Sequence, residues 1–301
     1  MTQMTKNLHL EHPEDLILEG VTSVLDWFAS PSNISVKIDG APAIVWGTNP
    51  ENGKFFVSTK SVFNKKKVKI CYTNDDILDQ FDNQKLQTIL HGCLEFLPRT
   101  EGIYQGDWIG YGGRSTYTPN TVTYDFPEPV EAAIIVAPHT VYTGDTLAGA
   151  VASPLTEVLE SSDDVLFFQP TVDCTERFGG ADMLSMLRST VEKATFLSPK
   201  EAREVRIIIN AFIREGKSIS PHLLSEIIGD WELTVAYFQV IDLKEQMMEA
   251  MLIYDDHCAS IGDDPILAEG FVRSNKYGTM KLVDRYEFAR ANFNNQKFRS
   301  N

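Results

Sequence analysis

The spacing of apolar positions changes along the chain and predicts four segments. Residues 1–30 contain a helix of the core that begins near Pro13, because apolar side chains then recur at helical spacing. Residues 31–178 alternate apolar and polar positions in short runs separated by turns, which is typical of strands. Helical spacing returns over 179–257, and strand-like alternation follows over 258–301. We therefore expect an α+β fold, a mainly β core with a helical insertion before its last strands.

Local signals mark boundaries inside these segments. Ile34–Ile38 alternates as a strand does, and Asn52-Gly53 is a strong hairpin signal. One helix is predicted over 76–97. Ser198-Pro199-Lys200-Glu201 has the spacing of a capping box with proline at the first helical position. Helical spacing over Trp231–Tyr254 predicts one or two further helices.

The composition narrows the class of protein. Of 301 residues, 43% are hydrophobic, so the chain can bury one large core or two ordinary ones. A formal net charge of −15 argues against a protein that coats DNA or a membrane surface. No run approaches the roughly 18 apolar residues of a membrane span, and the cysteines lack metal or disulfide spacing. We expect an intracellular, cytoplasmic protein in which any contact with nucleic acid requires a local basic patch.

Chemistry is first indicated by Lys37-Ile38-Asp39-Gly40, where a predicted strand runs into a turn. A lysine removed from water gives up its proton more readily, and the neutral amine is a nucleophile toward carbonyl or phosphoryl centres. Asp39 can accept hydrogen bonds from turn amides or from the ammonium, and Gly40 lets the backbone pass close to a ligand. The same residues would also suit an exposed strand-end lysine before an Asp-Gly turn.

Three further motifs follow in order. They are Gly106-Asp107-Trp108-Ile109-Gly110, Glu269-Gly270-Phe271-Val272 in a late predicted strand, and Lys281 in the last one. With the Lys37 motif, this set resembles the covalent nucleotidyltransferase superfamily of ATP-dependent DNA and RNA ligases and GTP-dependent mRNA capping enzymes. The resemblance implies a ligase-type, ATP-grasp-like core of antiparallel sheets with helices, here with a helical insertion and without an OB-fold.

The resemblance also implies roles for the motif residues. Lys37 is the implied nucleophile, which attacks the α-phosphorus of ATP, releases pyrophosphate and forms lysyl-AMP; Asp39 of the same motif joins it in the implied catalytic set. Glu269 corresponds to a glutamate associated with the divalent cation, Mg²⁺ or Mn²⁺, and Lys281 to a lysine that contacts the α-phosphate. Mg²⁺ is typically bound by one or two carboxylates plus phosphate oxygens and water, so Glu269 can suffice as the protein ligand.

Other residues are implied in binding the nucleotide. Asp107 occupies the place of a glutamate that meets the ribose, although aspartate is one methylene shorter. Tyr124 and Phe126 follow at about the distance of the aromatic that stacks on the base, and a place in the strand core suits either of them equally well. Lys60 lies close to a motif of RNA ligases, and Gly40 lies beside the nucleophile.

The sequence departs from the superfamily in ways that bear on its branch. Ala41 follows the nucleophile motif where many members have arginine or serine, and Lys281 lacks the second lysine of the usual Lys-x-Lys pair. Lys276 and Arg285 are the candidates to replace that lysine. Too few residues follow Lys281 for the OB-fold domain of DNA ligases and capping enzymes, which favours the RNA-ligase-like branch. The chain also resembles ligase-like proteins of large tailed phages, which implies the host cytoplasm.

One dense basic run could supply the patch that an acidic ligase needs. Lys65, Lys66, Lys67 and Lys69 could hold the phosphate backbone of a nucleic-acid end, and a solvated loop with outward charges explains the run equally well. Our leading expectation is an ATP-dependent RNA-ligase-like enzyme that passes AMP to a 5′-phosphate, from which a 3′-hydroxyl displaces it. The alternatives are a GTP-using or protein-modifying nucleotidyltransferase and an inactive, ligase-derived nucleic-acid-binding protein.

Overall fold

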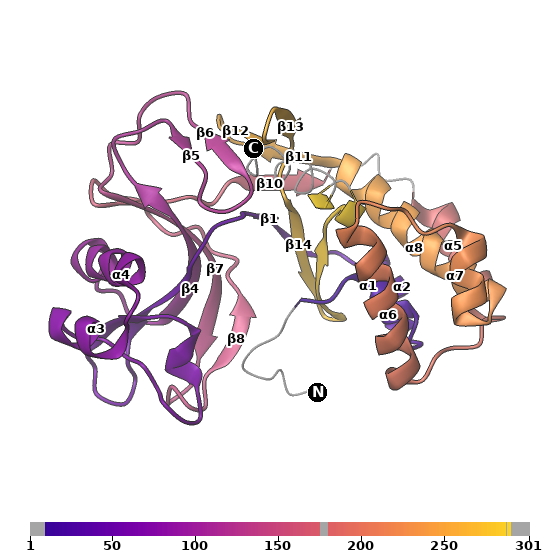
Figure 1. Cartoon of the computed structure of the whole chain (residues 1–301), viewed down its shortest axis with the longest axis horizontal. Coiled ribbons are helices and arrows are strands. Elements are labelled where there is room, and N and C mark those ends of the chain that lie inside the picture. Colours follow the sequence, from indigo (N-terminus) through magenta and orange to yellow (C-terminus); the bar gives the residue numbers. More distant parts are fainter. Residues whose placement is uncertain (1–9, 175–179, 287, 290–301) are drawn as a thin grey trace. The chain divides into compact units, whose positions relative to one another are not determined.

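The computed structural model describes residues 10–174, 180–286 and 288–289 and has an α+β fold with mostly antiparallel sheets (Figure 1). The chain forms two compact units, and each is described by itself. Unit 1 contains Ile38–Gln169 and Asp256–Ala259, whereas the described part of unit 2 comes from Leu10–Lys37, Pro170–Asp255 and the residues from Ser260 onward. Among the described helices, none combines the length and apolar character needed to cross a bilayer.

Unit 1 is built on a six-stranded sheet in the order β3-β2-β4-β7-β8, with β9 parallel to β7. The strands are β2 (Ala43–Thr48), β3 (Phe55–Ser58), β4 (Ile103–Tyr111), β7 (Ile134–Thr143), β8 (Val151–Pro154) and β9 (Val165–Phe167). Its remaining elements are η1 (Lys60–Phe63), α3 (Asn74–Gln80), α4 (Gln84–Phe96) and the hairpin of β5 (Thr116–Tyr117) and β6 (Thr123–Asp125).

Both faces of this sheet are covered, which explains why four consecutive residues of β2, 44–47, are buried. Ile44 and Trp46 point to one face and pack with side chains of α3 and α4, such as Leu90. Val45 points to the other face and packs with Phe63 and its neighbours. A strand that is covered on both sides loses the polar alternation of a surface strand.

Unit 2 combines a small sheet with a group of helices. The sheet has the order β1-β14-β15, and β1 (indigo in Figure 1) lies beside β14 (yellow) although nearly the whole chain separates them. Its strands are β1 (Asn33–Lys37), β14 (Gly270–Asn275) and β15 (Gly278–Leu282). The helices are α1 (Pro13–Ile17), α2 (Ser23–Ala29), α5 (Gly180–Val191), α6 (Pro199–Arg214), α7 (Pro221–Ile228) and α8 (Trp231–Glu249). The other strands are β10 (Thr171–Cys174), β11 (Met251–Tyr254), β12 (Cys258–Ile261, whose first two residues belong to unit 1) and β13 (Asp264–Ile266).

Side-chain caps start the long helices where the sequence indicates. The predicted capping box at the start of α6 is confirmed, because Ser198 accepts from the backbone N–H of Glu201 and the Glu201 carboxylate accepts from that of Ser198. Asp230 caps α8 by accepting from the N–H of Leu233 at 2.7 Å. Each cap satisfies a backbone donor that the first helical turn cannot.

A buried arginine ties the small sheet to α2. Arg273 of β14 is 5% exposed and donates to the carbonyl oxygens of Trp27, Phe28 and Ser30 at the end of that helix. Its guanidinium also lies 4.8 Å from the centre of the Trp27 ring. The carbonyls left unpaired at the end of α2 therefore receive a charged donor from a strand.

The structure corrects the extent of three predicted helices. The single helix predicted from Pro13 is divided into α1 and α2, with Gly20 at φ +76° between them. The helix predicted over 76–97 is divided into α3 and α4, because Asn83 caps a new start by accepting from Leu86 N–H at 3.0 Å. Helical spacing over Trp231–Tyr254 ends with α8, and its last residues form β11, which pairs with β10.

Candidate functional site

The register of the small sheet in unit 2 brings two predicted site residues onto one face. Ser35 pairs with Val272, which in turn pairs with Lys281. Residues opposite each other in antiparallel strands share a face, and so do residues two apart along a strand. Because Lys37 lies two residues after Ser35, it is on the same face as Lys281.

The opposite face of this sheet is the buried one. Val36, Phe271 and Leu282 form one cross-strand row, and Arg273 and Met280 belong to the next. All five are at most 9% exposed. Burial of this face fixes the register, since a slip of one residue would turn both lysines into the core.

Glu269 contacts Lys37 directly. The Lys37 ammonium donates to Oε2 of Glu269, with the two side chains 30% and 11% exposed. The next residue, Gly270, has φ +155°, and a Cβ there would lie 2.2 Å from the carbonyl oxygen of Leu282. Glycine is therefore required where β14 begins, directly after the carboxylate that reaches Lys37.

Lys281 is partly buried beside this pair. Burial lowers the pKa of Lys281, and the positive charges of Lys37 and Arg285 lower it further, whereas Glu11 and Asp15 oppose the shift. Two ammonium groups and one carboxylate thus gather on one sheet face. Such a face can attract a phosphate group and can offer an amine as a nucleophile when its proton is removed.

Asp39 lies in unit 1 and anchors a loop. Its Oδ1 accepts from the Asn120 amide at 2.8 Å, and its Oδ2 accepts from the N–H groups of Thr121 and Val122 at 2.8 and 3.0 Å. The N–H of Asp39 donates to the hydroxyl of Tyr124 at 2.6 Å. The carboxylate of Asp39 therefore holds the end of the nucleophile motif against the loop before β6.

Gly40 lies against the strand that carries Asp107. A Cβ at Gly40 would meet Cβ of Asp107 at 2.7 Å and the Trp108 carbonyl oxygen at 2.9 Å, so the position demands glycine. The carboxylate of Asp107 lies 3.8 Å from Nε2 of His139. His139 follows Pro138 at the point where the β4–β7 register shifts, and bulges of this kind often redirect side chains. Sequence reasoning missed His139, because a lone histidine in a strand carries no motif.

The two predicted base-stacking aromatics lie in different environments. Tyr124 is 1% exposed, and its ring packs edge-on against Phe168. Phe126 is only half-buried and lies 5.1 Å from Phe168 and 6.4 Å from His257, measured between ring centroids. Of the two predicted residues, Phe126 is the one with ring surface available to a ligand.

The predicted basic run divides into exposed and engaged lysines. Lys65, Lys66 and Lys67 are exposed in the loop after η1, and Lys60 is exposed at the start of η1. Lys69 instead donates to the Gln80 carbonyl oxygen at the end of α3, and its ammonium lies 4.5 Å from the centre of the Phe81 ring. The structure gives Lys69 a packing role that the sequence pattern did not indicate.

The candidates for a second cation beside Lys281 have other partners. Arg285 pairs with Asp15 at 2.9 Å and with Glu14 at 3.5 Å, and its side chain is 9% exposed. Lys276 is exposed and lies over the ring of Tyr277. Of the two, Arg285 acts on Lys281 through its positive charge, which lowers the pKa of Lys281.

A divalent cation would have Glu269 as its protein ligand on this face. Within residues 10–174, 180–286 and 288–289, His, Cys, Asp and Glu side chains form no group of three or more that could hold a metal ion. A single carboxylate fits Mg²⁺ when substrate oxygens and water complete its shell. The residues present therefore suit a cation that arrives with a nucleotide.

Comparison with known proteins gives a family without an assigned activity. No curated protein and no solved structure matches the chain. The model of a family of unknown function, DUF6267, matches residues 7–227 and 223–297. Since these matches span most of its length, the chain belongs to the DUF6267 family.

Proposed function

We propose that this protein is a nucleotidyltransferase that forms a covalent lysyl-AMP intermediate at Lys37 and transfers the AMP to the 5′-phosphate of a polynucleotide, with RNA favoured. The observation that carries the proposal is the shared sheet face of Lys37 and Lys281, with Glu269 in contact with Lys37. The sequence motifs that resemble the superfamily thus supply a nucleophile, a phosphate ligand and a carboxylate within one unit.

The first chemical step uses groups on this face. The neutral amine of Lys37 attacks the α-phosphorus of ATP, a P–N bond forms, and the bond to the β-phosphate oxygen breaks as pyrophosphate leaves. Glu269 is in contact with the ammonium and can accept its proton before the attack. Lys281 supplies positive charge beside the reacting phosphate, the kind of stabilisation on which phosphoryl transfer depends.

Mg²⁺, with Glu269 as its protein ligand, would neutralise phosphate charge when it is bound. The amine of Lys37 holds the nucleotide covalently after the first step. Removal of the metal with a chelator should therefore prevent formation of the adduct and leave an existing adduct intact.

The next two steps require an acceptor. A 5′-phosphate oxygen attacks the phosphorus of lysyl-AMP, so that the P–N bond breaks and a phosphoanhydride forms. A 3′-hydroxyl then attacks the 5′-phosphate, which forms a phosphodiester and releases AMP. Lys65, Lys66 and Lys67 are exposed and suit the backbone of the acceptor strand.

The finer assignment of the fold belongs to the same proposal. We assign the chain a ligase-type, ATP-grasp-like core with a helical insertion. The pairing of β1 with β14, on either side of the inserted helices in the sequence, supports this assignment. Residues proposed for the ribose and base, Asp107 and Phe126, lie in unit 1 and stay predictions.

Labelling of the protein by nucleotide tests the proposal. Purified protein is incubated with Mg²⁺ and α-labelled ATP, or α-labelled GTP in parallel, and label is measured on the denatured chain. We expect an acid-labile, alkali-stable adduct from ATP that is absent in Lys37→Ala. Lys276→Ala removes an exposed lysine from the turn between β14 and β15 and serves as the control, which should label as the wild type does.

Each other outcome has a defined meaning. Preference for GTP would favour capping-type or protein-modifying chemistry over ligation. Wild-type protein that is shown by intact mass to carry no existing adduct, and that takes up neither label, would overturn the proposal. Nucleic-acid binding that persists in Lys37→Ala, with no adduct in the wild type, would favour the inactive binding protein.

A further inference from the structure

A second set of charges lies deeper in unit 2. Glu14 and Asp15 of α1, Lys244 of α8 and Arg285 after β15 form a group that we call the buried charge cluster. Their side chains are 1%, 6%, 3% and 9% exposed, in that order. Charges this far from water persist only when they are paired.

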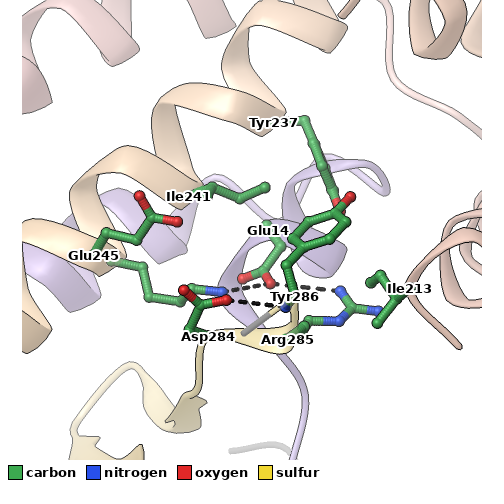
Figure 2. Close-up of a pocket in the computed structure, with 9 residues that line it drawn as sticks. Glu14, Ile213, Tyr237, Ile241, Glu245, Asp284, Arg285 and Tyr286 are labelled. Atoms are coloured by element: carbon green, nitrogen blue, oxygen red, sulfur yellow. Dashed lines mark hydrogen bonds and ion pairs between the residues drawn. The ribbon is translucent and has the colours of Figure 1, made fainter. Parts of the chain in front are cut away.

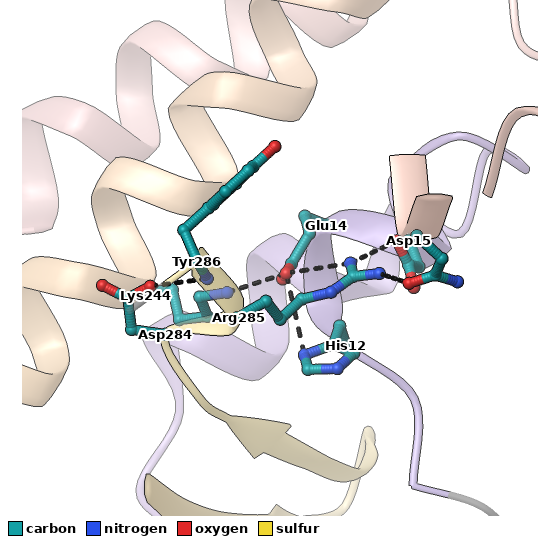
Figure 3. A network of polar contacts seen from close by, with 8 residues as sticks. His12, Glu14, Asp15, Lys244, Asp284, Arg285 and Tyr286 are labelled. Atoms are coloured by element: carbon teal, nitrogen blue, oxygen red, sulfur yellow. Dashed lines mark hydrogen bonds and ion pairs between the residues drawn. The ribbon is translucent and has the colours of Figure 1, made fainter. Parts of the chain in front are cut away.

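The contacts inside the cluster converge on Glu14. Its Oε1 accepts from the Lys244 ammonium at 2.7 Å and lies 3.5 Å from the Arg285 guanidinium, which also donates to Asp15 at 2.9 Å. Figure 3 shows Glu14 between Lys244 and Arg285, with His12 close to its carboxylate. Burial raises the pKa of Glu14, but the charge of Lys244, the charge of Arg285 and the hydrogen bond from Lys244 outweigh burial, and the pKa is lowered to about 2.

The buried charge cluster is continuous with the segment that carries Lys281. The backbone N–H of Lys281 donates to the Glu11 carbonyl at 3.2 Å, so the chain before α1 runs beside β15. Arg285 lies four residues after Lys281, and its positive charge lowers the pKa of Lys281. His12, in turn, responds to the charges of both Lys281 and Lys244. The buried charge cluster and the sheet face that carries Lys37 and Lys281 therefore share one electrostatic environment.

Counting charges shows what Lys244 does. Glu14 and Asp15 contribute two negative charges, and Lys244 and Arg285 contribute two positive ones. Glu245 and Asp284 line the adjoining pocket in Figure 2, but they reach solvent, which screens them. Without Lys244, the buried charge behind Lys281 would change from balanced to negative and would repel a phosphate group.

We propose that Lys244 is a positioning residue for the Lys37–Lys281 face: by neutralising Glu14 it keeps this face attractive to the phosphates of a nucleotide. The inference rests on the proposed function and gives the helical segment 179–257 a part in it, because α8 supplies Lys244. Lys244 acts from outside the reacting groups: it pairs with Glu14, Glu14 lies next to Arg285, and the charges of Arg285 and Asp15 act on Lys281.

Opposite charge changes test this inference. Lys244→Met makes the cluster negative, Glu14→Gln makes it positive, and the double variant restores balance. The readout is the ATP concentration that gives half the maximal rate of self-labelling. We expect this concentration to rise about tenfold in Lys244→Met, the order of magnitude for one uncompensated unit charge acting through protein at an effective dielectric constant of about 20. It should fall in Glu14→Gln and return to within about twofold of the wild type in the double variant.

A purely structural role would give a different result. It would lower the fraction of protein that labels and leave the half-saturating ATP concentration unchanged in all three variants, and this outcome would overturn the inference. If Lys244→Met does not fold, Glu14→Gln and the double variant decide by the same criterion. Lys200→Met removes a lysine that is 87% exposed on α6 and should change nothing.

Binding of inorganic pyrophosphate separates failure of this inference from failure of the proposed function. Calorimetry measures pyrophosphate affinity without any covalent step. If the wild type forms no adduct, but Lys244→Met still weakens pyrophosphate binding and the double variant restores it, the inference survives and the nucleotidyltransferase proposal fails. If adduct forms normally and pyrophosphate affinity is equal in all variants, only the inference fails.

Discussion

Two lysine–glutamate pairs in unit 2 have the same chemistry and opposite surroundings. Lys37 and Glu269 are 30% and 11% exposed on a sheet face, whereas Lys244 and Glu14 are 3% and 1% exposed between helices. An ion pair near water can exchange partners at little cost, but a buried pair cannot, because a charge that loses its closest partner in the interior is not compensated by water. The Lys37–Glu269 pair can therefore open to admit a ligand, whereas the Lys244–Glu14 pair keeps two opposite charges at fixed positions in the interior.

The largest expected effect on the reaction rate concerns the sheet face that carries Lys37 and Lys281. Lys281→Met should lower the maximal rate of self-labelling about hundredfold or more, because it removes a positive charge beside the developing phosphate charge. Rapid quenching of the labelling reaction measures this rate. An unchanged rate would remove Lys281 from the proposed site, and Lys276→Met on the neighbouring turn is the control.

The next effect separates the two pairs by stability. Lys244→Met should lower the free energy of unfolding by about 3–5 kcal/mol, because it leaves Glu14 buried without its closest partner. Lys37→Met should lower it by less than about 1 kcal/mol, as for a pair near the surface. Urea denaturation measures both. Equal losses would mean that burial does not distinguish these pairs.

The buried charge cluster should also make stability depend on pH. The pKa of His12 is lowered from 6.5 to about 2, chiefly by burial; Glu14 opposes this shift, and the charges of Arg285, Lys281 and Lys244 contribute to it. The unfolded chain gains a proton at His12 below its ordinary pKa, and the folded chain does not. Stability conferred by the neutral imidazole is therefore present above pH 6.5 and lost as the pH falls toward 2.

The lowered pKa of Glu14 extends this loss below pH 4.5, because the unfolded carboxylate then takes up a proton first. Between pH 6.5 and 4.5 we expect a loss of about 2–3 kcal/mol from His12 alone. Denaturation over a pH series checks this value, and His12→Gln should flatten the curve in that interval. A variant as sensitive to pH as the wild type would contradict the assignment.

The smallest expected effect concerns the three exposed lysines in the loop after η1. Replacing Lys65, Lys66 and Lys67 by alanine should weaken single-stranded RNA binding about tenfold at moderate salt, with stability unchanged. The plot of log affinity against log salt should become less steep by about 2 units of slope, the contribution of three phosphate contacts. The matched control replaces three exposed lysines elsewhere, Lys85, Lys200 and Lys217. Equal slopes for both triple variants would assign the loop no specific part in binding.

Local signals determined much of the secondary structure. The capping box at Ser198 and the alternation over Ile34–Ile38 correctly predicted α6 and β1, because both depend on residues close in sequence. Predictions were wrong where a tertiary contact overrode the local pattern. Met251–Tyr254 continued the helical spacing of α8 but forms a strand, since β10 offers it a partner for its backbone.

The candidate site shows the same division. The sequence by itself determined which residues are candidates for chemistry: a lysine before Asp-Gly, a glutamate before glycine, and a lysine in the last predicted strand. Only the tertiary structure decided that Lys37, Glu269 and Lys281 belong together, through a pairing of β1 with β14 and β15 across most of the chain. It also separated Lys69 from the exposed lysines and assembled Glu14 with Lys244 and Arg285. Burial and ion pairing between segments that are distant in the sequence leave no pattern among neighbouring residues. The place of Lys69 and the pairing of Glu14 with Lys244 and Arg285 therefore follow only from the fold.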